Sequence, residues 1–463
     1  MRPSCTTSCS TAPQRVDPVI AWLHAGPIRL KFQDGELRYL TVGDREIVRR
    51  VYFAVRDSHW DTAMPVFHRI DVQQKVDSFR ISLDAVCVND VANYHWSGEI
   101  VGTPEGKITF SVNGQSDTGF AAPRIGFCLL YGAEALAGQA YQLLDADGKA
   151  TPGAFPKDVS PQLLSEKFTA LRYTTPDGLS VTCRTAGGFG MEDQRNYCDS
   201  SYKAYHNLGY PWDVPKGQAK HDTFTLDVTG AHPAPDPAPT VALAIDAAIH
   251  KMPVLLPAMT SVKAAAFVAQ NSKRDGWTNA TTVAWAFNPS AHMPDDDMFF
   301  ENLSSVVDQA ATVRAVNPTA RLRVDPIGFD SPYPRPGRDP RNSGQFAAAW
   351  TTAMVGWLAR AGVDEAVFTT IPNAVLQGLV PLAGHAVHGL DTLAGDPRAV
   401  TGFAVDNTCW LVNLTAEAQT VTLPHPATRL ARLTAGTHEF TPAPAHGVTL
   451  TLGPLEVCRV GWK

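Results

Sequence analysis

Short apolar and polar runs alternate along the first half of the chain and are separated by tight turns. Ile28–Phe32 and Leu37–Leu40 each alternate in this way, and Asp34-Gly35 lies between them. Period-two alternation on both sides of an Asp-Gly pair is typical of a β-hairpin. Similar runs recur at 79–83, 107–112 and 224–228. The pattern predicts an N-terminal antiparallel β-sandwich over residues 17–230.

The hydrophobic period changes after a proline-rich stretch at residues 231–239, which predicts a stiff, extended linker. Apolar stripes from Phe299 to Val316 and from Phe346 to Leu358 predict helices. Buried strands are predicted at 241–246, 281–287, 321–328 and 365–371. Strand-helix alternation favours a parallel sheet. Residues 240–395 are fewer than the about 250 of a complete eight-fold barrel, so we expect a shortened TIM-barrel-like α/β domain.

The ends of the chain complete the predicted architecture. Cys409–Leu414 and Gly447–Leu452 are strand-like, and predict a small C-terminal β-sandwich over residues 396–463. Residues 1–16, rich in Ser, Thr and Cys, are expected to form a disordered tail. The expected fold class is therefore multidomain, α/β plus β. The free edges of the shortened barrel would need a cover, and a homo-oligomer is one way to provide it.

Composition narrows the function classes. The net charge of −6 comes without a basic block, which excludes nucleic acid and anionic membrane as expected partners. There is no apolar run long enough to span a bilayer and no apolar core of a secretory signal, so we expect a cytoplasmic protein. The eight cysteines include no Cys-x-x-Cys pair, which argues against structural zinc. Cys198 alone lies in a charged context, where a nucleophilic thiol is a weaker alternative to a buried one.

The most polar stretch of the chain runs from Gly190 to Lys203. Three carboxylates, one guanidinium, one ammonium and two amides fall within fourteen residues. Such groups suit gripping a polyhydroxylated ligand and moving protons on it. They equally suit a structural knot of salt bridges, and residue types alone do not decide between the two. A smaller group of Arg56, Asp57 and Trp60 either stacks a sugar ring or staples a hairpin.

Several segments resemble the D-apionate lactonase family. In the N-terminal region they are Gly35–Leu40, Val55–Thr62 and above all Met191–Lys203; in the central region they are Ala286–His292, Val324–Pro326 and Gln345–Trp350. The resemblance implies an N-terminal β-domain, a barrel related to glycoside hydrolases and a C-terminal β-domain. It also implies a carbohydrate-active hydrolase that opens the ring of D-apionolactone to give D-apionate. This chain resembles a shortened, divergent member, because Phe267–Asn271 and Val367–Thr370, which correspond to barrel strand ends, contain no glutamate.

Lactone opening needs a base for water, a cation or donors for the oxyanion and a proton for the ring oxygen. The candidate catalytic residues are Glu192, Asp193 and His292. The candidate substrate-binding residues are Arg195, Asn196, Asp199, Lys203, Asn288 and Asp325. No cofactor is expected. A metal held by His292, Asp325 and Asp246 is a weaker alternative, and the ligand is expected to be a sugar lactone or sugar acid.

Two other readings remain open. The first is a relative that is non-catalytic or has altered chemistry, and that binds carbohydrate or supports a partner subunit. The shortened barrel favours this alternative. A glycosidase-like enzyme would need two opposed carboxylates, either about 5 Å or about 6.5–9.5 Å apart. The absence of glutamate from the two strand-end segments counts against the glycosidase reading. A long loop between Asp330 and Arg341 carries three arginines that would attract a carboxylate product.

Overall fold

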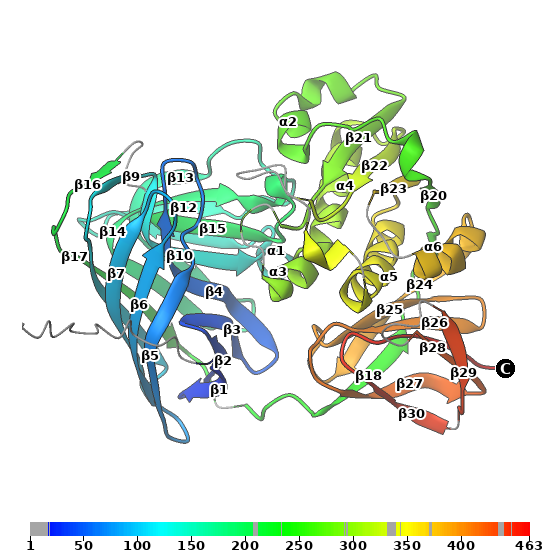
Figure 1. The fold of residues 1–463 in the computed structure, drawn as a ribbon, viewed down its shortest axis with the longest axis horizontal. Helices are drawn as coiled ribbons and strands as arrows, with labels where there is room; N and C mark the ends of the chain where they lie inside the picture. Colours follow the sequence, from blue (N-terminus) through cyan, green and yellow to red (C-terminus); the bar gives the residue numbers. More distant parts are fainter. Residues whose placement is uncertain are drawn as a thin grey trace, which may run out of the picture.

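A computed structural model describes residues 17, 19–206, 212–232, 234–290, 292, 295–330, 339–342, 344–369, 373–433, 439–445 and 447–463. The predicted tail at 1–16 and residues 331–338 of the arginine-containing loop lie outside this part. Figure 1 shows three units in chain order: a large β-domain, an α/β unit and a C-terminal β-domain.

Among the described residues, fifteen strands of the N-terminal β-domain form one continuous sheet that curls around its core (Figure 1). They are β1 (Ile20–Ala25), β2 (Ile28–Gln33), β3 (Glu36–Val42), β4 (Arg45–Arg56), β5 (Pro65–Gln74), β6 (Phe79–Val88), β7 (Asn93–Gly102), β8 (Lys107–Ser116), β10 (Arg124–Gly132), β11 (Ala140–Leu144), β12 (Ala150–Ala154), β13 (Ser165–Thr174), β14 (Ser180–Asp193), β15 (Ser201–His206) and β17 (Lys220–Thr229). The main path runs β1-β2-β3-β4-β10-β15-β14-β17-β8-β7-β6-β5. A short helix α1 (Ala133–Leu136) follows β10, and β9 (Phe120–Ala122) pairs with β16 (Trp212–Val214).

Most strands of this sheet alternate between buried and more exposed side chains, and two strands that face another domain do not. In β6, Phe79, Ile81 and Leu83 are buried while their neighbours are more exposed, as period two requires. Strand β10 instead is buried at every position, and β4 nearly so. One face of these two strands lines the domain core. The other face packs against Met298 of the α/β unit, so these strands form the floor between two domains.

The α/β unit is built on four parallel strands in the order β20-β23-β22-β21. The strands are β20 (Val254–Leu256), β21 (Thr282–Phe287), β22 (Arg321–Ile327) and β23 (Glu365–Phe368). The helices are α2 (Phe267–Asn271), α3 (Asp296–Glu301), α4 (Ser305–Val316), α5 (Gln345–Arg360) and α6 (Asn373–Leu379). Short 3-10 turns are η1 (Gln194–Tyr197) in the β-domain and η2 (Ala258–Thr260), η3 (Arg274–Trp277), η4 (Asn302–Ser304), η5 (Pro340–Asn342) and η6 (Val380–Leu382) here. The edge strands of this sheet are β20 and β21, and a homo-oligomer that covers an edge stays a prediction.

Three predicted elements of the α/β unit need correction. The strand predicted at Val241–Asp246 lies in the C-terminal sheet, where it pairs with two strands of that domain, and β20 takes a place in the parallel sheet instead. Phe267–Asn271 is helix α2 and not a strand end. The helix predicted from Phe299 to Val316 is interrupted by the turn η4. A short apolar run fits either a strand or a buried helix, which explains the second error, whereas the first arises because the run does not specify which sheet accepts the strand.

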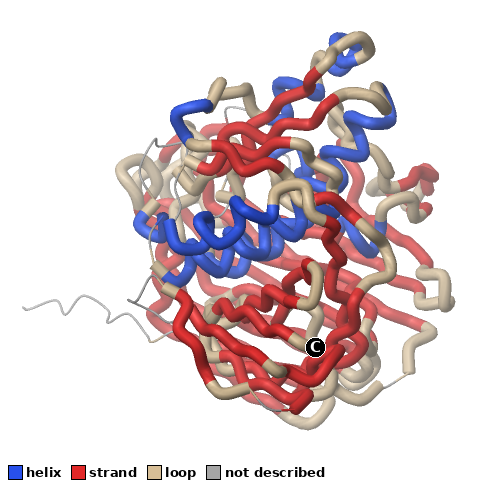
Figure 2. Tube along the Cα trace, turned by 90° about the vertical axis from the view of Figure 1, so that its right-hand side faces the viewer, coloured by secondary structure: helices blue, strands red, loops and turns tan. Residues whose placement is uncertain are grey.

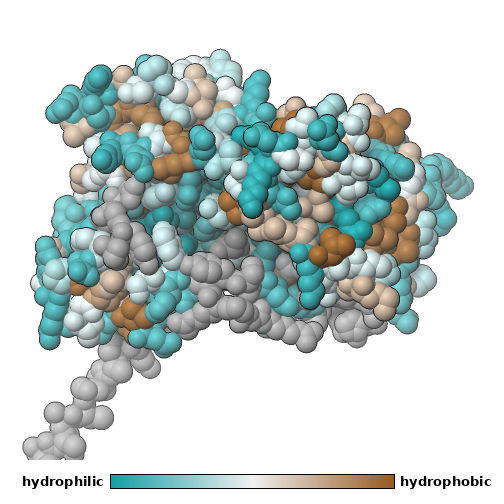
Figure 3. Space-filling view, turned by 90° about the horizontal axis from the view of Figure 1, so that it is seen from above, coloured by the Kyte–Doolittle hydropathy of each residue, from teal (hydrophilic) through white to brown (hydrophobic). Residues whose placement is uncertain are grey.

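The C-terminal sheet runs β29-β28-β31-β26-β25-β24-β18-β27-β30, and β19 pairs with β24. Its strands are β18 (Thr240–Ile245), β19 (His250–Lys251), β24 (Ala386–Ala394), β25 (Val400–Val405), β26 (Thr408–Asn413), β27 (Gln419–Ala427), β28 (Arg429–Leu433), β29 (Phe440–Ala443), β30 (Gly447–Leu452) and β31 (Val457–Gly461). Helix α5 packs on β25 and β26, and Figure 2 shows helices layered between two sets of strands. Among the described residues no helix has the length and apolarity needed to cross a membrane. Figure 3 shows hydrophilic and hydrophobic residues intermixed on the upper face.

A buried ion network joins the β-domain to the start of helix α3. Arg38 Nη2 and Arg50 Nη1 donate to the two oxygens of Asp295, at 2.8 and 2.9 Å. Arg38 also pairs with Glu301 at 3.2 Å, and Arg50 with Glu36 at 2.6 Å. Asp295 in addition caps α3 through the Met298 amide. These charges lie on different chain segments, so they fix the α/β unit over the β4-β10 floor.

The Asp295 network predicts a specific acid sensitivity. Burial opposes ionisation of Asp295, but the charges of Arg50 and Arg38 lower its pKa from 3.8 to about 2. A carboxylate whose pKa is lower in the folded state stabilises the fold at pH values above its unfolded-state pKa. This stabilisation is lost as the pH falls through the folded-state pKa, here between pH 4 and 2. Roughly 2 kcal/mol of unfolding free energy should disappear in that window. Asp295→Asn should flatten this part of a pH series of urea unfolding, whereas Asp275→Asn, at an exposed turn, should not. An unchanged slope for Asp295→Asn would contradict the assignment.

Candidate functional site

The polar motif spans a hairpin at the domain boundary. Strand β14 ends at Asp193, the turn η1 follows, and β15 returns antiparallel. Glu192 lies directly opposite Lys203 in this pairing. Successive residues of a strand point to opposite faces of the sheet. Glu192 and Lys203 therefore point to one face, and Asp193 points to the other. The motif is therefore divided between two environments.

Asp193 and Arg195 form a structural knot on one side of the hairpin. Arg195 Nη2 lies 2.7 Å from Asp193 Oδ2, and both side chains are fully buried. Asp193 also accepts from the Arg195 and Ser160 amides. The remaining Arg195 donors reach the carbonyls of Pro156 and Lys157. These contacts occupy the hydrogen-bonding groups that a substrate or a water would need.

Asn196 belongs to the same knot. Its amide nitrogen donates to the carbonyls of Ser160 and Asp193, and its oxygen accepts from Asn271 of helix α2. The turn is thus fastened to the α/β unit. Cys198, the possible nucleophile of this segment, is also enclosed, because burial raises the pKa of its thiol to about 12. A thiol with that pKa is not ionised at neutral pH and is a poor nucleophile.

The other side of the motif meets His292. Asp199, which is buried, accepts from His292 Nδ1 at 2.7 Å and from Asn302 Nδ2 at 3.1 Å. His292 follows strand β21 of the α/β unit, whereas Asp199 follows the turn η1 of the β-domain. Two residues that sequence analysis singled out separately are therefore in contact. The His292 side chain keeps 16% of its surface exposed, and the ring of Tyr197 packs edge-on against it at 5.0 Å.

The electrostatic surroundings favour a neutral His292. Burial lowers its pKa, the hydrogen bond and charge of Asp199 oppose that shift, and the nearby charges of Lys203 and Arg56 reinforce it. With Nδ1–H donating to Asp199, the neutral ring would present Nε2 as an acceptor. An imidazole held in one orientation by a buried carboxylate is the arrangement of a general base.

Three buried cations adjoin this dyad, and we call Arg56, Arg124 and Lys203 the basic cluster. Arg56 on β4 lies opposite Arg124 on β10, and Lys203 lies on β15, the next strand along. Each residue is at most 5% exposed. Arg56 Nη2 donates to the carbonyl of His292 at 3.3 Å, and the Arg124 guanidinium lies 3.7 Å from the ring centre of Tyr205. Burial lowers the pKa of Lys203 to about 7, with the two arginine charges acting in the same direction.

The two remaining substrate-binding candidates, Asn288 and Asp325, make hydrogen bonds that support neighbouring segments of the chain. Asn288 accepts from the amide and hydroxyl of Ser290 and donates to the Asp330 carbonyl at 2.6 Å. Asp325 is fully buried and accepts from Ser261, from the Val262 amide and from Arg323. Asn288 thus holds its own loop, and Asp325, inside strand β22, holds the segment at Ser261 and Val262. No group of three or more His, Cys, Asp or Glu side chains arranged for a metal occurs in the described part of the chain.

Sequence reasoning missed Arg124, Tyr205 and Asn302, and it left the role of Arg56 open. Arg124 opens an otherwise apolar strand, which is the one signal that the sequence offers. Its pairing with Arg56 depends on the β4-β10 register. Asp57 proves to be a turn residue, because its buried carboxylate accepts from the His59 and Asp61 amides.

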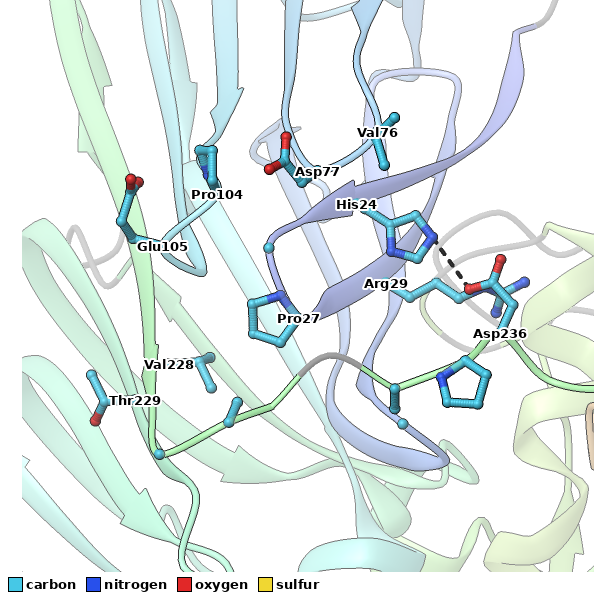
Figure 4. Close-up of a pocket in the computed structure, with 16 residues that line it drawn as sticks. His24, Pro27, Arg29, Val76, Asp77, Pro104, Glu105, Val228, Thr229 and Asp236 are labelled. Atoms are coloured by element: carbon cyan, nitrogen blue, oxygen red, sulfur yellow. Dashed lines mark ion pairs between the residues drawn. The ribbon is translucent and has the colours of Figure 1, made fainter.

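A separate groove of about 640 Å³ lies between the linker and the turns at one end of the β-domain (Figure 4). Asp236 of the linker faces His24 and Arg29 there, at 3.2 and 3.3 Å. None of the predicted catalytic or binding residues lines it. These ion pairs hold the linker against the β-domain, and we assign the groove no chemistry.

Solved structures give only weak similarities to the whole chain. A β-arabinopyranosidase covers 95% of this chain and 99% of its own at 9% identity, with a TM-score of 0.30. A galactose mutarotase-like protein from Lactobacillus casei covers 45% of this chain at 12% identity, with a TM-score of 0.32. Neither similarity bears on what this chain does.

Sequence comparison is more informative. Residues 9–231 match the family model of the D-apionate lactonase N-terminal domain, residues 231–378 that of its TIM barrel domain, and residues 397–460 that of its C-terminal immunoglobulin-like domain. A D-apionate lactonase from Brucella anthropi is 30% identical over 217 residues, or 46% of this chain and 36% of that protein. The match with this curated relative thus spans little more than a third of its length.

Proposed function

Because the chain belongs to the D-apionate lactonase family, we propose that it is a hydrolase that opens a sugar-acid lactone, with His292 as its general base. The observation that carries this proposal is the 2.7 Å contact between His292 Nδ1 and Asp199. It supplies an oriented imidazole at the boundary of the two domains. The neighbouring basic cluster supplies positive charge where an oxyanion would form.

In the proposed reaction His292 acts first as a base and then as an acid. His292 Nε2 takes a proton from water as the oxygen attacks the lactone carbonyl carbon. The oxyanion that forms is stabilised by the positive charge of Arg56, Arg124 and Lys203. When the carbonyl re-forms, the ring C–O bond breaks and protonated His292 returns the proton to the leaving oxygen. The acid product then ionises, so one proton is released per turnover.

Glu192 and Asp193 have different places in this proposal. Glu192 faces the same side as Lys203 and is close enough to it to affect its pKa. It therefore suits accepting a hydrogen bond from a substrate hydroxyl. Asp193, with Arg195 and Asn196, is better explained by the structural knot. Asp199 acts through His292 as a positioning residue.

Proton release tests the proposal directly. Purified protein should accelerate proton release from D-apionolactone, or from one member of an aldonolactone panel, above the spontaneous rate. A pH indicator in weak buffer follows the reaction, with and without a chelator. A flat response across the panel would contradict the proposal and leave carbohydrate binding without turnover.

The same assay carries a pH signature. Burial lowers the pKa of His292 below its ordinary 6.5, so the base remains neutral until the pH falls below that value. Lys203, whose pKa is about 7, loses its charge as pH rises through that value. The profile of kcat/KM should therefore fall on the acid side below 6.5 and on the alkaline side near 7. A profile of kcat/KM with no fall on the acid side would contradict a histidine base.

A further inference from the structure

The basic cluster differs from the other buried arginines of this chain. Arg50 pairs with Glu36 and Asp295, and Arg195 pairs with Asp193. Arg56 and Arg124 have no carboxylate within ion-pair distance in the described part of the chain, and their buried Nε atoms have no hydrogen-bond partner there. No hydrogen bond to the Lys203 ammonium is found among the described residues either. Buried cations are costly unless an anion pairs with them.

The three side chains lie on one face of the sheet. Arg56 and Arg124 are register partners, whereas Lys203 on the adjoining strand is opposite Leu130, six residues along β10 from Arg124. Their charges are close enough to interact, because both arginines lower the pKa of Lys203. Glu192 is the carboxylate that acts on Lys203, and the nearby Asp199 carboxylate is already paired with His292. When Lys203 is protonated, the three positive charges of the basic cluster therefore outnumber these two carboxylates.

This balance fits an anion better than a neutral ring. A lactone carbonyl carries no net charge and needs donors only at one oxygen. A carboxylate offers two oxygens that guanidinium groups can bind in parallel, and such charge-assisted bonds are about twice as strong as neutral ones. We propose that Arg56, Arg124 and Lys203 form a carboxylate-binding subsite that holds a sugar acid more tightly than the matching uncharged compound.

This inference rests on the proposed function only in naming the acid as the reaction product. Hydrolysis converts a neutral lactone into an anion beside the cluster, so the product should be retained. The expected consequence is competitive inhibition by sugar acids. The reaction that consumes the product would then have to draw it away for turnover to continue.

Isothermal titration of the full chain tests the subsite without any need for turnover. D-Gluconate and D-sorbitol share a six-carbon polyol chain and differ in one terminal carboxylate, and D-apionate and inorganic phosphate are measured beside them. Gluconate or apionate should bind at least about tenfold more tightly than sorbitol. Arg124→Gln should remove about tenfold or more of that preference. Arg69→Gln, at an exposed arginine on β5, should leave it unchanged.

Thermal unfolding separates ligand binding from a structural role. Removing an unpaired buried charge should leave the melting temperature of Arg124→Gln equal to or above that of the native chain. A lower melting temperature with unchanged gluconate affinity would overturn the subsite, as would gluconate binding no tighter than sorbitol. Phosphate binding as tight as gluconate would overturn the sugar-acid assignment. Sugar-acid binding with no turnover on any lactone would keep the subsite and reject the lactonase proposal.

Discussion

His292→Asn should lower kcat/KM for lactone opening by about 10²–10⁴-fold, the contribution usual for a positioned general base. The asparagine amide can occupy the place of Nδ1 and still donate to Asp199. The variant therefore keeps the contact that joins the two domains and removes only the nitrogen that would accept the water proton. Initial rates of proton release at pH 7 measure the effect, and circular dichroism checks the fold.

The chain offers a matched control for this variant. His95 Nδ1 lies 3.2 Å from Asp117 on the exposed side of β7, which reproduces the His-Asp pairing away from the site. His95→Asn should leave the rate unchanged. Folded His292→Asn protein with full activity would reject the histidine base. If Glu192→Gln then abolished turnover, the base would be Glu192.

The expected loss depends on a contact that sequence alone did not reveal. Asp199 and His292 lie 93 residues apart and belong to different domains. Each was recognisable as a polar residue in a suggestive context, Asp199 in the motif and His292 after a predicted strand. Their pairing arises only when the α/β unit packs on the β4-β10 floor. Local periodicity carries no information about such packing.

The fold itself was more accessible to pattern analysis. Alternation identified the antiparallel N-terminal domain, and the apolar stripe after Gly344 identified helix α5, which spans Gln345–Arg360. The strand at Val241–Asp246, which was assigned to the wrong sheet, shows what hydrophobic periodicity does not specify. Its hydrophobic run specifies a buried strand, but the sheet that accepts it depends on partners such as β24 and β27. Strand register has a similar effect at the candidate site, because the pairing of β4 with β10 places Arg124 opposite Arg56.

Within the motif, the structure places neighbouring positions in different surroundings. Successive residues of β14 project to opposite sides, so Glu192 faces Lys203 while Asp193 enters the knot with Arg195. The ligand-binding reading suits one side and the salt-bridge reading suits the other. The two readings can be separated by neighbouring substitutions on the same strand.

Asp193→Asn should therefore destabilise the protein by about 3 kcal/mol, because it removes the fully buried carboxylate that pairs with Arg195 and leaves that guanidinium only Asp308, which is partly exposed and 3.3 Å away. Urea unfolding followed by tryptophan fluorescence measures the loss. Glu192→Gln is the matched control, since it makes the same chemical change one residue away on the opposite face. It should cost less than Asp193→Asn, because Glu192 is partly exposed and forms no ion pair within 4 Å among the described residues, although its charge acts on Lys203.

Activity completes the test. Asp193→Asn protein that remains folded should keep most of its turnover, because Asp193 does not contact the His292 dyad or the basic cluster in the described contacts. Glu192→Gln should weaken substrate binding and raise KM. The opposite pattern, a stable Asp193→Asn protein without turnover, would return Asp193 to the catalytic residues. It would also mean that the motif acts through the face of β14 on which Asp193 contacts Arg195.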